Sequence, residues 1–392
     1  MEDKIMKRNI ISKFLCAILA VSLLSGCSLI SGLMPTEPTQ PQTPPDFSGI
    51  VDFVIHAEEG REFRILQITD TQIEDASKDR ISDRITDFTP LTEEELYNDV
   101  FYYIDEAVKE AQPDLILMTG DNIAGMFDDD GWCTLQLVDF MESLEIPWAP
   151  IFGNHDNETA MGVTWQCQQF ENAENCLFKR GDITGNSNYT IGIEQGGKLI
   201  KVIYMMDSNG CGSAYSYEQL PEFTYNEGED IKTTIGFADD QLQWIKTTSA
   251  RIYGALRYVP SKFLAMHINI DEFAEAALSK GYMDNDKTDT FVINDPTGVD
   301  FGMKYDPLIG EFSMPGLWDT LKNNGFDGVF CGHQHVNNVS MLYDGIRLSF
   351  GLKTGTHAYY RPDMLGGTLI TVAEGGESFS VEHIYVSMPE NQ

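Results

Sequence analysis

Five clusters of metal-competent side chains occur along the chain, and each directly follows a short apolar run. They are Asp70-Thr71-Gln72, Gly120-Asp121-Asn122, Gly153-Asn154-His155-Asp156, His267 and Gly332-His333-Gln334-His335. Carboxylate, imidazole and amide groups together suit divalent first-row metals such as Mn, Fe and Zn. A carboxylate can also bridge two cations roughly 3.5 to 4 Å apart, as in two-metal hydrolytic sites. The residue types therefore indicate metal-assisted chemistry.

Each cluster taken alone also has a purely structural interpretation. Asp70 and Asp121 suit turns or helix caps, Asn154 suits a turn, and His267 suits a hydrogen-bonded core position. Their shared position after apolar strands favours the metal site, because ligands bind beyond the carboxyl ends of strands in open α/β sheets. Glycines before Asp121, Asn154 and His333 permit tight turns there. We therefore expect the clusters to converge on one crevice.

The elements that must position these clusters alternate between strand and helix patterns. Short apolar runs predict buried strands, and apolar residues at helical spacing predict the connecting helices. This alternation predicts an α/β fold with a mixed sheet or a pair of sheets. The expected strands cover 64–69, 115–118, 148–151, 263–266, 328–330, 369–372 and 379–386, and the expected helices cover 96–111 and 239–248.

Composition restricts the class of protein further. The 392 residues are 42% hydrophobic and 11% aromatic, which supplies a substantial core and excludes disorder for most of the chain. Acidic residues outnumber basic ones by 61 to 26, and the net charge is −35. Such a charge repels a phosphate backbone, so we expect no general nucleic-acid binding.

The N-terminal segment resembles an export signal. Basic residues between Lys4 and Lys13 precede an apolar run over 14–24, which is too short to span a bilayer. The run ends in Leu24-Ser25-Gly26-Cys27, which resembles the lipobox of bacterial lipoproteins. An uncleaved anchor with an incidental cysteine is the alternative. We expect a signal peptide over 1–26 and lipid on Cys27, which would anchor the protein to the outer face of the cytoplasmic membrane or cell envelope.

The rest of the chain divides into a linker and one domain. Residues 27–45 include a stretch rich in Pro, Thr and Gln, which favours a solvated tether. No comparable break in composition follows, so residues 46–392 are expected to form a single domain. Five cysteines remain beyond Cys27, and their spacing leaves the disulfide pairing open.

The order of the five clusters, D-x-[HQ], GD, GNHD, H and GHxH, resembles the calcineurin-like metallophosphoesterase superfamily. The stretches 121–123, 330–338 and 355–359 are similar to its short purple-acid-phosphatase-like branch. The resemblance implies a two-sheet α/β sandwich flanked by helices, with a dinuclear centre at the strand ends. It implies two divalent metal ions, bridged by Asp121, with one held by Asp70, Gln72 and His335 and the other by Asn154, His267 and His333.

Two positions depart from the superfamily pattern. Gln72 stands where histidine is usual, and an amide oxygen is a weaker donor than imidazole for borderline metals. Ala124 stands where purple acid phosphatases carry tyrosine. Without a phenolate ligand we expect neither a purple colour nor an obligatory ferric ion.

The expected chemistry is phosphoester hydrolysis by a metal-bridging hydroxide. His155 is the expected general acid, with Asp156 stabilising its imidazolium, and Asn122 and His357 are expected to contact the substrate. The alternative is a non-catalytic lipoprotein that binds metal or phosphate. A proton donor beside the ligands favours catalysis, because a binder needs none. The sequence does not indicate whether the substrate is a monoester or a diester, which metal is bound, or what the oligomeric state is.

Overall fold

The computed structural model describes residues 46–74, 92–128, 130–209, 236–284, 290–308 and 314–389. Residues 46–392 form one compact unit. The expected signal peptide, Cys27 and the Pro-rich linker lie outside the described residues. Within the described ranges, no helix is both long enough and apolar enough to cross a membrane.

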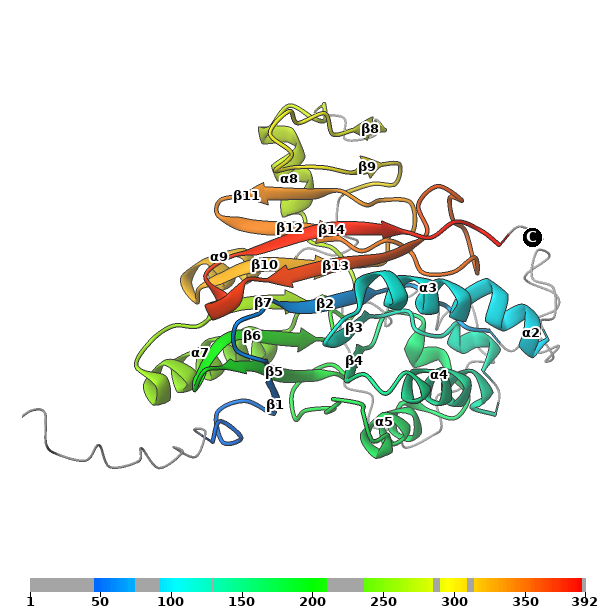
Figure 1. Cartoon of the computed structure of the whole chain (residues 1–392), viewed down its shortest axis with the longest axis horizontal. Coiled ribbons are helices and arrows are strands. Elements are labelled where there is room, and N and C mark those ends of the chain that lie inside the picture. The colour runs from blue at the N-terminus through cyan, green and yellow to red at the C-terminus, as the bar shows by residue number, and fades with distance from the viewer. Residues whose placement is uncertain are drawn as a thin grey trace, which may run out of the picture. The chain divides into compact units, whose positions relative to one another are not determined.

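Two large mixed sheets form the centre of this unit (Figure 1). The seven-stranded sheet has the order β1 (Phe53–His56), β5 (Asn188–Gln195), β6 (Lys198–Met206), β7 (Ser261–Ala265), β10 (Phe326–Cys331), β12 (Ile346–Phe350) and β11 (Ser340–Tyr343). The five-stranded sheet has the order β14 (Phe379–Tyr385), β13 (Gly366–Val372), β2 (Phe63–Ile68), β3 (Leu115–Thr119) and β4 (Trp148–Ile151). A small ribbon pairs β8 (Phe291–Val292) with β9 (Met303–Lys304).

The directions of the strands bring the turns that follow parallel strands to one edge of each sheet. In the five-stranded sheet β2, β3 and β4 are parallel neighbours. In the seven-stranded sheet β6, β7, β10 and β12 are parallel neighbours. The carboxyl ends of neighbouring parallel strands lie at the same edge of their sheet, so each sheet presents a row of strand ends at one edge.

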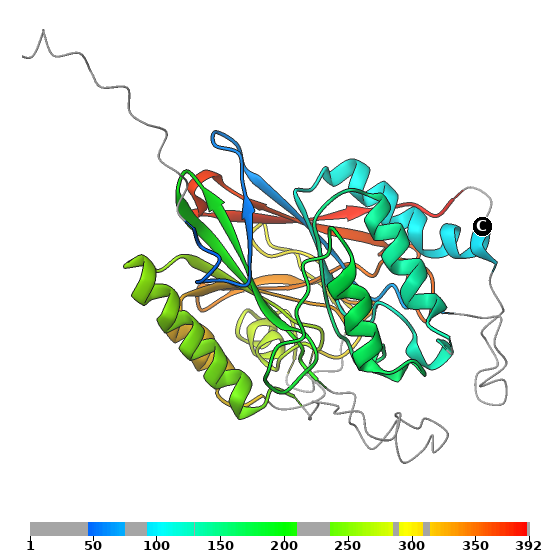
Figure 2. The ribbon, with the colours of Figure 1, turned by 90° about the horizontal axis from the view of Figure 1, so that it is seen from below.

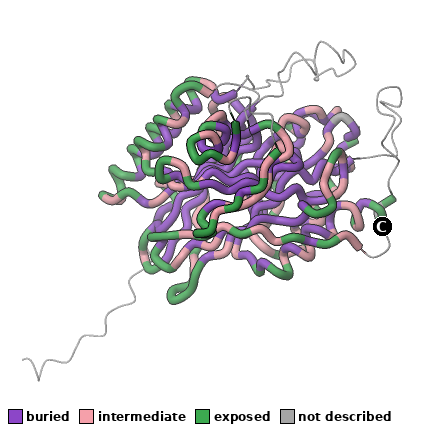
Figure 3. Tube along the Cα trace, turned by 90° about the horizontal axis from the view of Figure 1, so that it is seen from above, coloured by how far each residue is buried: buried purple, intermediate pink, exposed green. Residues whose placement is uncertain are grey.

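Apolar packing on both faces holds the seven-stranded sheet in place. Along β6, Ile203 and Met205 pack into the cluster shared with the five-stranded sheet, whereas Val202 and Tyr204 pack into the cluster on the opposite face. Successive side chains of a strand point to opposite faces, so a strand buried on both sides is a nearly continuous apolar run. Figure 3 shows the buried strands inside an exposed rim of helices and loops.

Helices cover the outer sides of the sheets. Figure 2 shows α3, α4 and α5 on one side of the unit and α7 on the other. α3 packs on β2, β13 and β14, and α9 packs on β10. The helices are α2 (Glu93–Leu96), α3 (Tyr102–Ala111), α4 (Trp132–Ser143), α5 (Val163–Asn172), α7 (Asp239–Leu256), α8 (Glu272–Ser279) and α9 (Leu317–Asn323).

The observed elements confirm the expected α/β sandwich, with differences at helix ends. The expected helix over 96–111 contains a π-helical turn, Tyr97–Phe101, between α2 and α3. The expected helix over 239–248 continues to Leu256 and ends at Arg257, which has a left-handed backbone. Helical periodicity detects neither a local change of helix type nor the exact final turn.

Candidate metal centre

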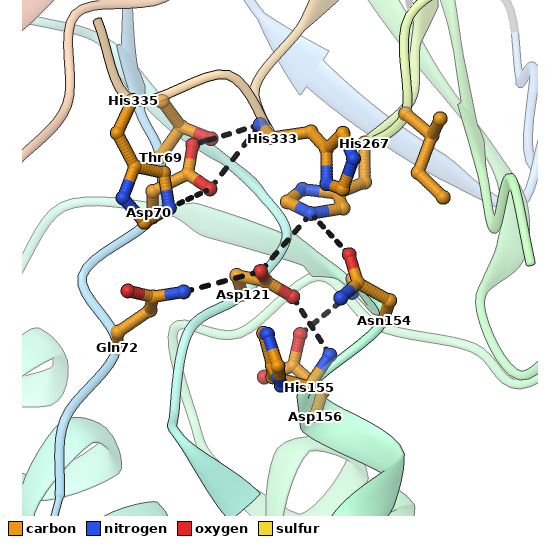
Figure 4. A network of polar contacts seen from close by, with 12 residues as sticks. Thr69, Asp70, Gln72, Asp121, Asn154, His155, Asp156, His267, His333 and His335 are labelled. Carbon is orange, nitrogen blue, oxygen red and sulfur yellow. Dashed lines mark hydrogen bonds and ion pairs between the residues drawn. The ribbon is translucent and has the colours of Figure 1, made fainter. Parts of the chain in front are cut away.

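The seven expected metal ligands lie at the carboxyl ends of five strands and point toward one another (Figure 4). Three strands of the five-stranded sheet and two of the seven-stranded sheet contribute. The five-stranded sheet supplies Asp70 and Gln72 after β2, Asp121 after β3 and Asn154 after β4, and the seven-stranded sheet supplies His267 after β7 and His333 and His335 after β10.

One group of donor atoms surrounds His267. Its Nε2 lies 3.2 Å from Oδ2 of Asp121 and 3.1 Å from Oδ1 of Asn154. Ligand atoms of Asp121, His267 and His333 all lie within 4.8 Å of one another. Two imidazoles, a carboxylate and an amide oxygen form a donor set that suits Zn, Mn or Fe.

A second group surrounds Asp70. Its Oδ1 lies 3.4 Å from Nε2 of His335, and ligand atoms of Asp70, Asp121 and His335 lie within 4.8 Å of one another. Nε2 of Gln72 lies 3.3 Å from Oδ2 of Asp121, and the buried Oε1 of Gln72 has no hydrogen-bond partner among the described residues. The two ends of an amide exchange places by rotation, so the orphaned oxygen suits a cation. Asp121 belongs to both groups, as a bridging carboxylate must.

Carbonyl oxygens orient two of the imidazoles. Nδ1 of His267 lies 2.8 Å from the carbonyl oxygen of Thr119, and Nδ1 of His335 lies 2.8 Å from that of Tyr359. A carbonyl only accepts, so both Nδ1 atoms carry the proton and donate. Nε2 of each ring, which faces a carboxylate, is then the nitrogen with a lone pair for a cation.

The ligand turns have unusual backbone conformations. Asp70, Gln72, Asp121 and His333 have φ between 45° and 74°. Side chains other than glycine rarely adopt this left-handed region, and each such residue costs roughly 1 kcal/mol or more. Such strain persists only where the surrounding structure holds it, and here it coincides with four of the seven ligands.

Glycines allow the strand ends to approach one another. A Cβ at Gly153 would overlap the Asp121 backbone and carboxylate, and a Cβ at Gly332 would overlap Thr69 and lie 2.6 Å from Oδ2 of Asp70. Both positions therefore need glycine for a close approach, as the sequence indicates.

The charges of the site support one another in the absence of a cation. Burial raises the pKa of the Asp121 carboxyl, but His267 and His155 outweigh it and hold that pKa far below its usual range. Burial likewise raises the pKa of the Asp70 carboxyl, but His335 and His267 outweigh burial and lower that pKa. The buried Lys353 donates to the carbonyl oxygen of Asp70 over 2.7 Å. Two ionised, buried carboxylates are the expected environment of a divalent cation.

His155 lies at the edge of the site, with its side chain 34% exposed. Nδ1 of His155 lies 2.9 Å from Oε2 of Glu158, and its backbone N–H donates to Oδ1 of Asp121 over 2.8 Å. Desolvation lowers the pKa of this imidazole, but the charges of Glu158 and Asp121 outweigh that effect and raise the pKa to about 10. Bound divalent cations would lower it.

The charge of Asp156 adds to the rise in the pKa of the His155 imidazole, as expected, but its hydrogen bonds lie elsewhere. Its buried carboxylate accepts the backbone N–H groups of Asn122, Ile123 and Gly153 over 3.0, 3.1 and 2.6 Å. It therefore ties the turn after β3 to the turn after β4. The direct carboxylate partner of the His155 ring is Glu158, which sequence reasoning missed; its position three residues after His155 is the signal that was present.

The two expected substrate contacts also lie elsewhere. Asn122 is buried, and its amide donates to the Ile151 carbonyl over 2.8 Å and to Asp156. His357 is buried as well, with Nδ1 3.1 Å from the carbonyl oxygen of Gln72. Both side chains form hydrogen bonds with segments near the expected ligands and neither lines the pocket beside them, so their contact with a substrate stays a prediction.

A pocket of about 410 Å³ opens over the ligands. His155 and the half-exposed Tyr359 contribute to its wall, and the Tyr359 ring stacks on His335 with centroids 4.1 Å apart. A larger hollow of about 580 Å³ lies beside α3 and β14 and contains none of the expected site residues. The metal-centre pocket is lined by Gln72, Asp121, Asn154, His155, Asp306, Pro307, His333, Gln334, His335, Ala358 and Tyr359.

Two mixed sheets with a two-centred ligand set at their strand ends define the metallophosphoesterase class of fold. Residues 63–337 match the family described as Calcineurin-like phosphoesterase, and the chain belongs to that family.

Similar proteins include two from Arabidopsis thaliana. Probable inactive purple acid phosphatase 14 is 25% identical over 66% of this chain and 62% of its own length. Probable inactive purple acid phosphatase 29 is 26% identical over 76% of this chain and 73% of its own length. The chain thus spans about three fifths of the first relative. A solved dimetal phosphatase from Danio rerio has a TM-score of 0.42 and 11% identity, covering 83% of this chain and 99% of that one.

Proposed function

We propose that the protein is an extracytoplasmic, metal-dependent phosphoesterase that hydrolyses a phosphomonoester or a phosphodiester. The observation that carries this proposal is the carboxylate of Asp121. It belongs to both ligand groups, and it also accepts the backbone N–H of His155, which lines the same pocket. A proton donor held beside a two-cation site is what cleavage of a phosphoester requires.

The ligands described above would hold two divalent cations of the Mn, Fe or Zn type. When bound, the cations would polarise phosphate oxygens and make an ionised water available near neutral pH. His155 would then protonate the leaving oxygen through Nε2, since Nδ1 is engaged by Glu158. Asp121 would fix the distance between this proton donor and the bound phosphate.

The alternative is a non-catalytic protein that binds metal or phosphate with the same residues. Two relatives are named probable inactive purple acid phosphatases, and these names favour this alternative. His155 argues against it, because a pocket that only binds an ion has no use for a half-exposed proton donor oriented by a carboxylate.

Turnover of artificial esters separates the two functions. Purified protein would be loaded with Mn²⁺ and assayed on phenyl phosphate and diphenyl phosphate, with His155→Ala as the comparison, because phenolate needs a proton to depart. Release of phenol that His155→Ala reduces supports the enzyme, and the preferred ester gives the substrate class. Metal binding without turnover of either ester supports the non-catalytic alternative.

We also propose that lipid on Cys27 anchors the protein to the outer face of the cytoplasmic membrane or cell envelope. One acyl chain binds a membrane only marginally, so stable anchoring requires the additional chains that lipoprotein processing would supply. Cys27→Ala should move the protein from the detergent phase to the aqueous phase. A Cys27→Ala protein that stays entirely in the detergent phase would reject the lipid anchor.

A further inference from the structure

We propose that Glu158 is a positioning residue that holds the His155 imidazole with Nε2 directed at the leaving oxygen. This inference rests on the proposed phosphoesterase function and deepens it, since it identifies the group on which the proton donor depends. The Glu158 carboxylate lies 2.9 Å from Nδ1 of His155.

The local backbone brings the two side chains together. His155 precedes the short 3-10 turn η4 (Asp156–Glu158), and the Glu158 N–H donates to the His155 carbonyl oxygen over 3.2 Å. The same carbonyl accepts the N–H of Gly125 over 3.2 Å. A Cβ at Gly125 would lie 2.5 Å from that carbonyl oxygen, so the loop after β3 fits closely against this turn. The turn is therefore fixed before a substrate arrives.

Burial makes the carboxylate of Glu158 an effective partner. Its side chain is only 8% exposed, whereas the His155 side chain is 34% exposed. A hydrogen bond with an ionised acceptor is shorter and stronger than a neutral one, and a low local dielectric strengthens it further. Glu158 is thus buried beside the ring, whereas His155 itself lines the pocket.

Asp156 cannot take over this task in the observed arrangement. Its carboxylate oxygens accept N–H groups from the turns after β3 and β4. The two acidic residues that flank Asn157 therefore have separate tasks. Asp156 shapes the loop, and Glu158 orients the ring.

The contact defines the proton-transfer step. The oxygen of an ionised water, which has already lost one proton to solvent, forms the new bond to phosphorus, and the bond from phosphorus to the leaving oxygen breaks. The electron pair of that bond goes to the leaving oxygen, which takes the proton from Nε2 of His155. The imidazole is left neutral, with Nδ1–H donating to Glu158. A ring that is free to rotate would present Nε2 to the leaving oxygen less often.

Leaving groups of different basicity therefore differ in their need for Glu158. 4-Nitrophenolate departs without a proton, whereas phenolate and alkoxides depart poorly unless they are protonated. We expect Glu158→Gln to reduce kcat on phenyl phosphate about 10- to 100-fold, which is part of the rate enhancement that general acid catalysis contributes. The same variant should reduce kcat on 4-nitrophenyl phosphate less than about 3-fold. If the enzyme prefers diesters, the corresponding diester pair replaces these substrates.

The experiment compares Glu158→Gln, Glu158→Asp, His155→Ala and the double variant His155→Ala/Glu158→Gln in the metal-loaded protein. The double variant should match His155→Ala alone, because Glu158 acts only through that ring. Glu142→Gln is the control, since Glu142 is an acid far from the metal ligands that accepts Nε1–H of Trp148 over 2.7 Å. It should affect both substrates equally.

A readout independent of turnover separates this inference from the proposed function. In protein labelled with ¹⁵N histidine, Glu158→Gln should shift the imidazole nitrogen signals of His155, and Glu142→Gln should not. Equal losses on both substrates, or losses that add to those of His155→Ala, would overturn the role of Glu158. A shift of the His155 signals in Glu158→Gln, found together with a wild-type protein that cleaves neither ester, would support the contact and reject the phosphoesterase.

Discussion

The backbone N–H of His155 donates to Oδ1 of Asp121, while Oδ2 of the same carboxylate lies 3.2 Å from Nε2 of His267. One side chain therefore connects the proton donor with the cation sites. Because both oxygens are engaged, a shift of Asp121 moves the donor and the ligands together. This coupling makes Asp121 the position at which substitution should be most informative.

Asp121→Asn should release metal and abolish most activity. Asparagine retains an oxygen that can accept the His155 N–H, so the turn should survive, but a neutral amide cannot bridge two cations as a carboxylate does. We expect a loss of more than about 100-fold in activity, as for a lost metal site. Gln72→Ala should lose less. Elemental analysis after desalting gives the metal content, and equal, mild losses from both variants would contradict the shared carboxylate.

Gln72→His should tighten metal retention at the Asp70 group. Imidazole binds borderline first-row metals better than an amide oxygen does. The new ring N–H would need a hydrogen-bond partner of its own, and an unmatched one can cost roughly 10- to 100-fold in affinity. Dialysis against a weak chelator measures the outcome. If the variant and the parent release metal identically and Asp70→Ala also has no effect, this strand end holds no metal.

Gly332→Ala should destabilise the protein and loosen the Asp70 group. The added Cβ would displace Thr69, whose hydroxyl donates to Oδ2 of Asp70 over 2.8 Å. Overpacking of this kind costs about 1 to 3 kcal/mol. Gly254→Ala is the matched control, because a Cβ there meets nothing within 4 Å and alanine favours the helix by about 1 kcal/mol. Urea unfolding should shift the two variants in opposite directions.

Stability should fall as the pH drops below about 6.5, in part through His383, which lies outside the metal centre. Desolvation lowers its pKa to about 4, and the Thr368 hydroxyl and the Asn338 carbonyl satisfy the neutral ring. The unfolded chain therefore binds more protons than the folded one between these values, so this contribution is lost as the pH falls through that window.

The size of the His383 contribution is measured by comparison with His383→Gln. Its partial exposure reduces the expected effect to about 1 to 2 kcal/mol. Urea unfolding of both proteins at pH 7.5 and pH 5 gives the difference. We expect the wild type to lose more stability than the variant on acidification, and equal losses would exclude His383.

The sequence alone predicts the strands that carry the ligands, because each is an apolar run that ends in polar residues. β5 and β6 were not expected, although their hairpin turn consists of Gly196 and Gly197, both with positive φ. Asp207 follows β6 directly, but its carboxylate accepts the backbone N–H groups of Asn186 and Asn209, and a search that starts from clusters of ligands passes over this single residue.

The sequence predicted which side chains meet at the strand ends, but it did not predict the residues that support them. Ligands are distinguished by residue type, whereas Asn122 and His357 differ from substrate contacts only in the direction of their side chains. The same holds for Asp156 and Glu158: both carboxylates follow His155 closely, and only the turn η4 decides which one reaches the ring. Side-chain direction depends on packing between segments far apart in the sequence.

The contact between His333 and Asp70 joins segments 263 positions apart, and one comes from each large sheet. Bound cations would fasten the two halves of the sandwich to each other, because the ligands meet only when both sheets are docked. Each cation at 100 times its dissociation constant would stabilise the folded chain by about 2.7 kcal/mol. The metal supply in the surroundings would then set the lifetime of the fold, and a chelator would act on the protein as a denaturant.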